Sequence, residues 1–257
     1  MNLETIQVLN QGKVSTIMLN RPDMLNAVNE QLVWDLQKAT ENVMNDDSVK
    51  VVILTGAGRG FSAGADLSER KASWSGSKDA LIRGYKPSFE SIINMPKPVI
   101  ASIPGPAAGI GAALAMSCDL RVMSEDSYLL SVFSNIALVP DGGLSWFLPK
   151  FMGYAKAYEH AIEAKKILAS DCLKYGIANK VVPSDQLEQI TLDWANQLAK
   201  RSSQSLNHTK RLMRESLAMS YWDTFSNEAE IQNELTVSDQ NREAVKAFLE
   251  KREPNFD

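Results

Sequence analysis

The sequence predicts an α/β protein with a helical C-terminal region. Short runs of mostly apolar, β-branched residues at 50–55 and 98–103 are typical of buried parallel strands, and segments with helical periodicity separate them. Beyond residue 183 only helical periodicity remains. A length of 257 residues fits one large domain or a domain with an appendage. We therefore expect a core over residues 1–190 and a helical region over residues 191–257.

The N-terminal half follows a strand and helix alternation. The first twenty residues alternate as a hairpin that is broken by a turn at Gln11 and Gly12. A helix over 32–43 then leads to the strand at 50–55, which predicts a right-handed crossover into a parallel pair. The elements expected next are a helix over 79–95 ended by Pro96, the strand at 98–103, a helix over 111–118 and a strand over 120–123.

The C-terminal half contains one more predicted strand, which lies near residues 177–182 and ends at Pro183. Four helical segments follow, at 187–198, 206–217, 225–237 and 245–249. The segment 68–78 is rich in serine and charge and is interpreted as a mobile loop, either a plain surface loop or a lid over a nearby site.

Composition excludes several classes of protein. Hydrophobic residues make up 44% and charged residues 23%, so a core can form, and a net charge of -4 does not favour nucleic-acid binding. The N-terminus lacks the pattern of a signal peptide, and no apolar run is long enough to span a bilayer. Cys118 and Cys172 lack CxxC spacing, and His160 and His208 lack a chelating pattern. We expect a cytoplasmic protein without a disulfide framework, a metal or a membrane span.

Two glycine-rich segments are candidate ligand loops. Gly56 to Gly60 follows a strand, but Phe61 to Gly64 prolong the loop, whereas a dinucleotide fingerprint opens directly into a helix. A surface turn remains an alternative there. The second segment, 105–111, runs straight into a helix, whose first amides are unpaired donors at the positive end of the helix dipole. Its small residues fit either an oxyanion site or tight packing of the helix on the sheet.

Six segments in register resemble one known family. They are LNRPDMLNA (19–27), LTGAGRGFSAGADL (54–67), KPVIASIPGPAAGIGAALAMSCD (97–119), LVPDGGLSWFLP (138–149), residues 168–182 and FLEKREPNF (248–256). Together they resemble the enoyl-CoA hydratase/isomerase, or crotonase, superfamily across nearly the whole chain. The likeness is greatest to its 1,2-epoxyphenylacetyl-CoA and Δ3,Δ2-enoyl-CoA isomerase branch.

The resemblance implies a spiral of strand-strand-helix units with a C-terminal helical region that forms a trimer or a dimer of trimers. It also implies an acyl-CoA thioester substrate, with coenzyme A as part of that substrate and no permanently bound cofactor. The backbone amides of Ala65 and Ile110 would hold the thioester oxygen while an enolate forms. Ile110 belongs to the glycine-rich segment where helix-end electrostatics independently favours an oxyanion.

The coenzyme A site is also implied by the resemblance. The candidate contacts are Asn26, Ala27, Ala63, Asp66, Phe248 and Lys251. Lys251, with Phe248, would act within its own subunit or across a subunit boundary, although a lysine near a chain end is often only a solvated charge. Asp66 has a second interpretation as a helix cap.

The reaction is indicated by one departure from the family and one carboxylate. Family hydratases use two glutamates to add water, and the matching positions here are Ala113 and Phe133, which cannot transfer protons. Asp141 lies in the Pro-acid-Gly context in which the isomerases place their acid–base group, among apolar neighbours that would raise its pKa. Its alternative roles are an ordinary turn or a helix N-cap.

Three functions follow from these residues. The first is an isomerase that shifts a carbon–carbon double bond, or rearranges an aryl epoxide, with Asp141 as acid and base. The second is a hydratase with acid–base groups from elsewhere, and the third is a catalytically silent acyl-CoA-binding protein. An acyl pocket would be lined by Trp74, Ala113, Phe133 and Trp146, with Tyr85 and Phe89 as further aromatic candidates, although each aromatic residue could equally be simple core.

Overall fold

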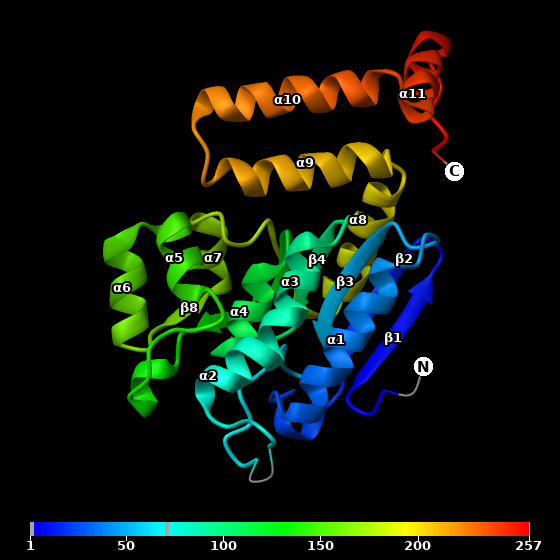
Figure 1. Ribbon diagram of the computed structural model, residues 1–257. Helices are drawn as coiled ribbons and strands as arrows, with labels where there is room; N and C mark the ends of the chain where they lie inside the picture. The colour runs from blue at the N-terminus through cyan, green and yellow to red at the C-terminus, as the bar shows by residue number, and fades with distance from the viewer. Residues whose placement is uncertain (1–2, 70–71, 257) are drawn as a thin grey trace.

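The computed structural model describes residues 3–69 and 72–256. Its main sheet has six strands in the order β1-β2-β3-β4-β6-β9 (Figure 1). Only the β1–β2 pair is antiparallel, which confirms the predicted hairpin, and the remaining pairs are parallel. The strands are β1 (Ile6–Gln11), β2 (Val14–Leu19), β3 (Val51–Gly56), β4 (Val99–Ile103), β6 (Leu120–Ser124) and β9 (Lys180–Val182).

A second sheet of three short strands lies beside the first. It consists of β5 (Pro106–Ala108), β7 (Tyr128–Leu130) and β8 (Lys166–Leu168), in the order β5-β7-β8. The sequence did not predict it, because three residues are too few to show a hydrophobic period of two. Its edge strand β5 leads directly into α4 and so positions the second glycine-rich segment.

Helix α1 (Glu30–Met44) forms the crossover between β2 and β3, and these strands form the predicted parallel pair. Asn29 caps it by accepting a hydrogen bond from the Leu32 amide, and its buried face includes Leu32 and Leu36. Helix α4 (Ile110–Ser117) is buried along its whole length at the centre of the molecule. Three short 3₁₀ helices, η1 (Pro22–Met24), η3 (Phe133–Ile136) and η4 (Ser184–Gln186), and three α-helices, α5 (Leu144–Met152), α6 (Tyr154–Ile162) and α7 (Ala169–Lys174), complete the core.

The helix predicted over 79–95 is divided into three parts. They are α2 (Ser77–Asp79), a π-helix η2 (Ala80–Tyr85) and α3 (Lys86–Asn94). Pro87 has no amide hydrogen, so it cannot donate to the carbonyl of Arg83, four residues earlier. The preceding amide, that of Lys86, donates to the carbonyl of Leu81, five residues earlier, and this longer spacing widens the turn.

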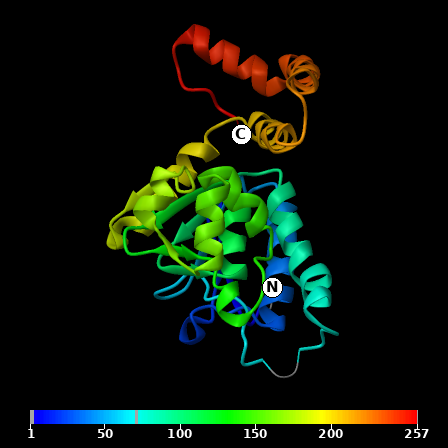
Figure 2. The same ribbon diagram turned by 90° about the vertical axis from the view of Figure 1, so that its left-hand side faces the viewer.

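The C-terminal helices divide into one that packs on the sheet and three that stand away from it. Helix α8 (Leu187–Ala199) buries Leu187, Ala195 and Ala199 against the sheet, so the expected boundary at residue 190 falls inside a core helix. The appendage consists of α9 (Ser203–Ser216), α10 (Tyr221–Thr236) and α11 (Asp239–Glu250). Helix α9 lies between the core and α10 in both ribbon views (Figures 1 and 2).

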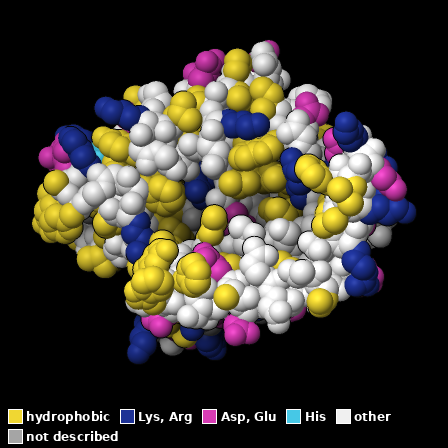
Figure 3. Space-filling model, turned by 90° about the horizontal axis from the view of Figure 1, so that it is seen from above, with side chains coloured by type: hydrophobic (Ala, Val, Ile, Leu, Met, Phe, Trp, Pro, Cys, Tyr) yellow, Lys and Arg dark blue, Asp and Glu magenta, His cyan; other side chains and the backbone are white. Residues whose placement is uncertain are grey.

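Many large hydrophobic side chains of the appendage face solvent. Seen from the appendage side, hydrophobic side chains gather in several clusters on the surface (Figure 3). The exposed members on or beside α9, α10 and α11 are Met213, Leu217, Met219, Tyr221, Trp222, Phe225, Val237, Val245, Phe248 and Leu249. Among the described residues, no helix combines the length and apolarity that crossing a bilayer requires.

Candidate active site

The loop after β3 and the loop after β4 pack against each other. Ser62 and Ala107 form an isolated parallel bridge, and the amide of Ala108 donates to the carbonyl of Ser62 at 2.9 Å. The closest approach is at Gly105, where a Cβ would lie 2.0 Å from the Arg59 carbonyl oxygen, and a Cβ on Gly64, at φ +96°, would lie 2.9 Å from the Ala108 carbonyl oxygen. Ala65 and Ile110 each lie three residues after the bridged pair, so they occupy corresponding positions on the two loops.

The amides of these two residues have no backbone partner within the part of the chain that the structure describes. Ala65 forms a parallel bridge with Val28, whose bonds go to Gly64 and Asp66, so the Ala65 amide points away from Val28. Ile110 is the first residue of α4, where the amide has no intrahelical acceptor. The two amides predicted to hold an oxyanion are therefore both available donors.

Asp141 lies on a loop that packs against the start of α4. A Cβ on Gly142 would lie 2.6 Å from the Cβ of Ala113 and 2.7 Å from Cδ1 of Ile110, so only glycine permits this approach. The approach brings the neighbouring Asp141 to the same end of α4 as the Ile110 amide. The N-cap of α5 is Gly143, with no side-chain cap, so Asp141 does not fill the capping role.

The environment of Asp141 favours its protonated form. Its Oδ1 atom is buried and has no hydrogen-bond partner among the described residues. Burial raises the pKa of this carboxyl from 3.8 to about 6. A carboxyl whose pKa lies near neutrality can accept a proton and release it again, which an ordinary surface aspartate does poorly.

Asp141 lines a cavity of about 670 Å³. Its lining is mostly apolar and aromatic, from the helices η2, α3 and α5, with Lys86, Glu90 and Arg214 as the other charged members. The residues are Leu81, Ile82, Tyr85, Lys86, Phe89, Glu90, Ile93, Asp141, Gly142, Gly143, Trp146, Phe147 and Arg214. The spacing of four between residues 81, 85, 89 and 93 was the signal in the sequence that could have found this wall.

The predicted acyl-pocket residues do not all meet. Trp146 lines the cavity beside Asp141, and Tyr85 and Phe89 lie on the wall from η2 and α3. Ala113 and Phe133 are buried behind the loops, against Gly142 and Gly109 respectively. Both residues have buried hydrocarbon side chains, so neither supplies a second acid.

Trp74 lies apart from this cavity. Its ring packs 5.4 Å from that of Trp34, between ring centroids, and covers Gly84, where a Cβ would approach it to 2.9 Å. It is not among the residues that line the space beside Asp141. Trp74 thus supports the π-helix from outside instead of forming the predicted wall.

The predicted coenzyme A contacts near the N-terminus surround the first glycine-rich loop. The side-chain amide of buried Asn26 donates to the carbonyls of Ala57 and Gly60 at 2.9 Å each, so it holds this loop in place. Ala27 is buried, whereas Ala63, like Ala65, is exposed at the surface where a ligand could reach it.

Asp66 is occupied by its own neighbours. Its carboxylate accepts from Arg21 at 2.9 Å and from the hydroxyl and amide of Ser68. The Ser68 hydroxyl and the Arg21 guanidinium hold the pKa of Asp66 below its usual value. This carboxylate fixes the turn that follows Ala65, while its amide donates to the carbonyl of Val28.

Phe248 and Lys251 lie at the far end of the appendage. Both are exposed on or just beyond α11, which lies beside one end of α10 (Figure 1). Neither is among the residues that line the cavity beside Asp141.

The dinucleotide site weighed for the first glycine-rich loop does not form in the described residues. The first helix after β3 in the described residues begins at Ser77, so no helix N-terminus faces the glycines at 56–60, as dinucleotide binding requires. Cys118 and Cys172 are buried and separate, and burial raises the pKa of each thiol to about 12. No group of three metal-binding side chains occurs in the described ranges.

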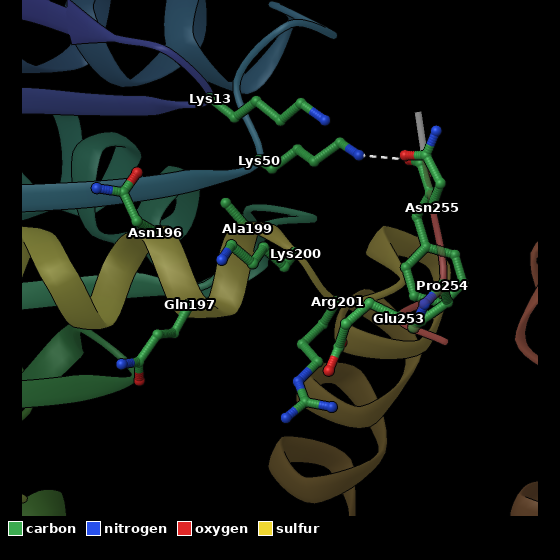
Figure 4. Close-up of a pocket in the computed structure, with 11 residues that line it drawn as sticks. Lys13, Lys50, Asn196, Gln197, Ala199, Lys200, Arg201, Glu253, Pro254 and Asn255 are labelled. Carbon is green, nitrogen blue, oxygen red and sulfur yellow. Dashed lines mark hydrogen bonds between the residues drawn. The ribbon is translucent and has the colours of Figure 1, made fainter. Parts of the chain in front are cut away.

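A larger cavity, of about 840 Å³, lies near the amino-terminal ends of β2 and β3 (Figure 4). Lys13 and Lys50, which precede β2 and β3, point toward the C-terminal tail, and the Lys50 ammonium donates to the Phe256 carbonyl at 2.5 Å. Ala65 and Ile110 instead follow the carboxyl ends of strands, where ligands bind in parallel sheets. Size alone therefore does not identify the site.

Comparison with known proteins agrees with this geometry. Residues 10–257 match the family described as enoyl-CoA hydratase/isomerase. The chain belongs to the enoyl-CoA hydratase/isomerase family. This confirms the resemblance seen in the six sequence segments and the predicted crotonase-type α/β fold.

Individual relatives carry both hydratase and isomerase names. The chain is 32% identical to a probable enoyl-CoA hydratase of Rhodobacter capsulatus, covering 100% of this chain and 99% of the relative. It is 33% identical to the 1,2-epoxyphenylacetyl-CoA isomerase of Escherichia coli, covering 95% and 94%. A crystal structure of an enoyl-CoA hydratase from Bacillus anthracis matches with a TM-score of 0.93 at 28% identity, covering 98% and 99%. The family is established by these matches, and the choice of reaction rests on the site.

Proposed function

We propose that this protein is an acyl-CoA isomerase that shifts a carbon–carbon double bond, or rearranges an aryl epoxide, with Asp141 as its acid and base. The observation that carries the proposal is a single carboxyl group with a raised pKa beside two unpaired amides. The two positions at which family hydratases carry glutamates are the buried hydrocarbons Ala113 and Phe133. One acid–base group suffices for an isomerisation, because no atom is added to the substrate.

The proposed reaction uses the amides for charge and Asp141 for the proton. The thioester oxygen accepts hydrogen bonds from Ala65 and Ile110, which stabilise the negative charge that develops when the substrate becomes an enolate. For a 3-enoyl thioester, ionised Asp141 removes a proton from the α-carbon, and the electron pair of the broken C–H bond forms the conjugated enolate. Protonation of the γ-carbon by the neutral Asp141 carboxyl then returns the electrons from the enolate oxygen and leaves the double bond next to the thioester. The intervening neutral carboxyl is favoured by the same burial that raises its pKa.

Coenzyme A enters as part of the substrate in this proposal. The exposed Ala63 and Ala65 would contact its pantetheine end, beside the loop that Asn26 holds. The exposed apolar side chains of the appendage support assembly into a homotrimer or a dimer of trimers.

A turnover screen tests the reaction. Purified protein is incubated with 3-enoyl, 2-enoyl and ring-epoxide CoA thioesters in deuterated buffer, and proton exchange and products are followed by NMR. We expect isomerised products, with deuterium at the carbon that receives the proton in the fraction of turnovers in which the neutral Asp141 carboxyl exchanges with the buffer before it returns the proton. Robust hydration of crotonyl-CoA would favour the hydratase that several relatives are named for. Thermal stabilisation by acyl-CoA without exchange or product would favour a silent binding protein.

A further inference from the structure

The cavity beside Asp141 contains a second polar group without a partner. Tyr85 lines the same space, and no hydrogen bond from its hydroxyl is found among the described residues. The charged groups on the lining are paired, since Lys86 contacts Glu90 at 3.2 Å and Arg214 contacts Asp119 at 2.7 Å. Within an otherwise apolar cavity, Asp141 and Tyr85 are thus the two groups left to meet a ligand.

The π-helix explains why Tyr85 faces this space. Tyr85 is the last residue of η2, and the widened turn sets the register of the residues that line the cavity, from Leu81 through Tyr85 to Phe89. Trp74 and Val33 pack against the preceding Gly84, where a Cβ would lie 2.9 Å from the Trp74 ring. Such π-type turns are frequent at functional sites, where they redirect a side chain.

The hydroxyl of Tyr85 is held in its protonated form. Burial, and then the nearby charge of Asp141, raise the pKa of Tyr85 to about 12. At any pH at which Asp141 works, Tyr85 is therefore a hydrogen-bond donor and not a second base. Tyr85 is only partly buried, so in the empty cavity its hydroxyl can meet water, and an oxygen atom of a bound ligand would take the place of that water as the acceptor.

We propose that Tyr85 is a specificity-determining residue that donates a hydrogen bond to an oxygen atom within the acyl group, so that the preferred substrates are acyl-CoA thioesters bearing an oxygen on their acyl part. This inference rests on the proposed function, because it takes the cavity to hold the acyl group. The aromatic walls from Phe89, Trp146 and Phe147 suit a ring-sized group.

A matched ligand pair tests this role by binding alone. Cyclohexylacetyl-CoA is compared, by isothermal titration calorimetry, with the three tetrahydropyranylacetyl-CoA isomers, in which a ring oxygen replaces one CH₂ group. An ether oxygen only accepts hydrogen bonds, so it reports on Tyr85 and not on an acceptor such as ionised Asp141. We expect one isomer to bind wild-type protein about 10- to 100-fold more tightly than cyclohexylacetyl-CoA.

Tyr85→Phe should abolish that preference while leaving cyclohexylacetyl-CoA affinity within about threefold of wild type. Tyr158→Phe, on the exposed face of α6, is the matched control and should keep the preference. The inference is overturned if no isomer binds more tightly than cyclohexylacetyl-CoA, or if Tyr85→Phe retains the preference or weakens all four ligands equally. Because no turnover is measured, failure of the isomerase proposal in the screen is a separate result.

Discussion

At the scale of single residues, the chemistry depends on how the fold keeps Asp141 short of hydrogen bonds. Asp66 and Asp119 show the contrast, because both are satisfied by cations and amides. Asp141 has the raised pKa of a carboxyl held for proton transfer, with one oxygen buried and unpaired.

Asp141→Asn should abolish turnover, by at least about 10³-fold, while acyl-CoA affinity stays within a few-fold of wild type. The amide cannot accept a proton but fills the same space. Glu90→Gln, which alters a paired carboxylate on the same cavity, is the matched control and should remain active. The measurements are steady-state kinetics and calorimetric binding of a saturated acyl-CoA. An active Asn variant would refute the assignment of Asp141.

The pH dependence follows from the same group. As a base Asp141 must be ionised, so kcat/KM should fall tenfold per pH unit below about 6. The folded pKa lies above the unfolded value of 3.8, so the folded state binds the proton more tightly and loses stability as pH rises from about 4 to 6. At pH 8 the free energy of unfolding of Asp141→Asn, measured by denaturant titration, should therefore exceed that of wild type by about 1 to 3 kcal/mol after allowing for partial exposure. At pH 4 the two proteins should differ little. Equal stability at both pH values would contradict the raised pKa.

At the scale of elements, the first turn of α4 is the part that supplies the oxyanion donor. Ile110→Pro removes that amide, and proline is compatible with the first position of a helix. We expect kcat to fall about 10²- to 10³-fold. Ile110→Ala is the matched control: it loses the buried side chain but keeps the amide, so it should unfold more easily yet retain most activity. Parallel loss of activity and stability in both variants would show that the loop only packs.

The contact between the Asp141 loop and α4 depends on Gly142. Gly142→Ala places a methyl group 2.6 Å from the Ala113 Cβ, so the loop must move and displace Asp141. We expect kcat to fall at least about tenfold, as misplacement of a catalytic group does. Gly12→Ala has nearly the same backbone, φ +59° against +60°, with no atom within 4 Å, and should cost stability alone. Equal activity in the two variants would contradict the positioning role.

The elements also show what the sequence could and could not predict. Strands β3 and β4 were predicted within one or two residues, because buried parallel strands have a continuous apolar pattern. The second sheet was missed because its strands contribute three residues each. Asp141 and the two loops were identified from local motifs, whereas the exclusion of Trp74 depends on tertiary packing against Trp34, which no local pattern encodes.

At the scale of the whole molecule, the appendage exposes large apolar side chains. Trp222 and Phe225 on α10 are exposed by 72% and 52%, and they lie in a group of apolar side chains of a kind that usually marks an interface. We expect Trp222→Glu with Phe225→Glu to lower the mass measured by light scattering, whereas Leu9→Glu on the edge strand β1 should not. An unchanged mass in the double variant would place the interface elsewhere.

The position of Lys251 on the appendage raises the question of which subunit it serves. It is the residue at the C-terminal end of α11 and does not line the cavity of its own Asp141, so we expect any role in coenzyme A binding to be at the site of a neighbouring subunit. Asp141→Asn and Lys251→Met chains are therefore co-refolded and assayed at low substrate concentration. If each site combines Asp141 from one chain with Lys251 from the next, random mixing restores about a quarter of the sites to full function, and activity exceeds the average of the two separate variants. If each site instead takes Asp141 and Lys251 from the same chain, the mixture shows only that average. Mixtures of Asp141→Asn with Lys246→Met, a variant of another exposed lysine on α11, should show the average activity in either case.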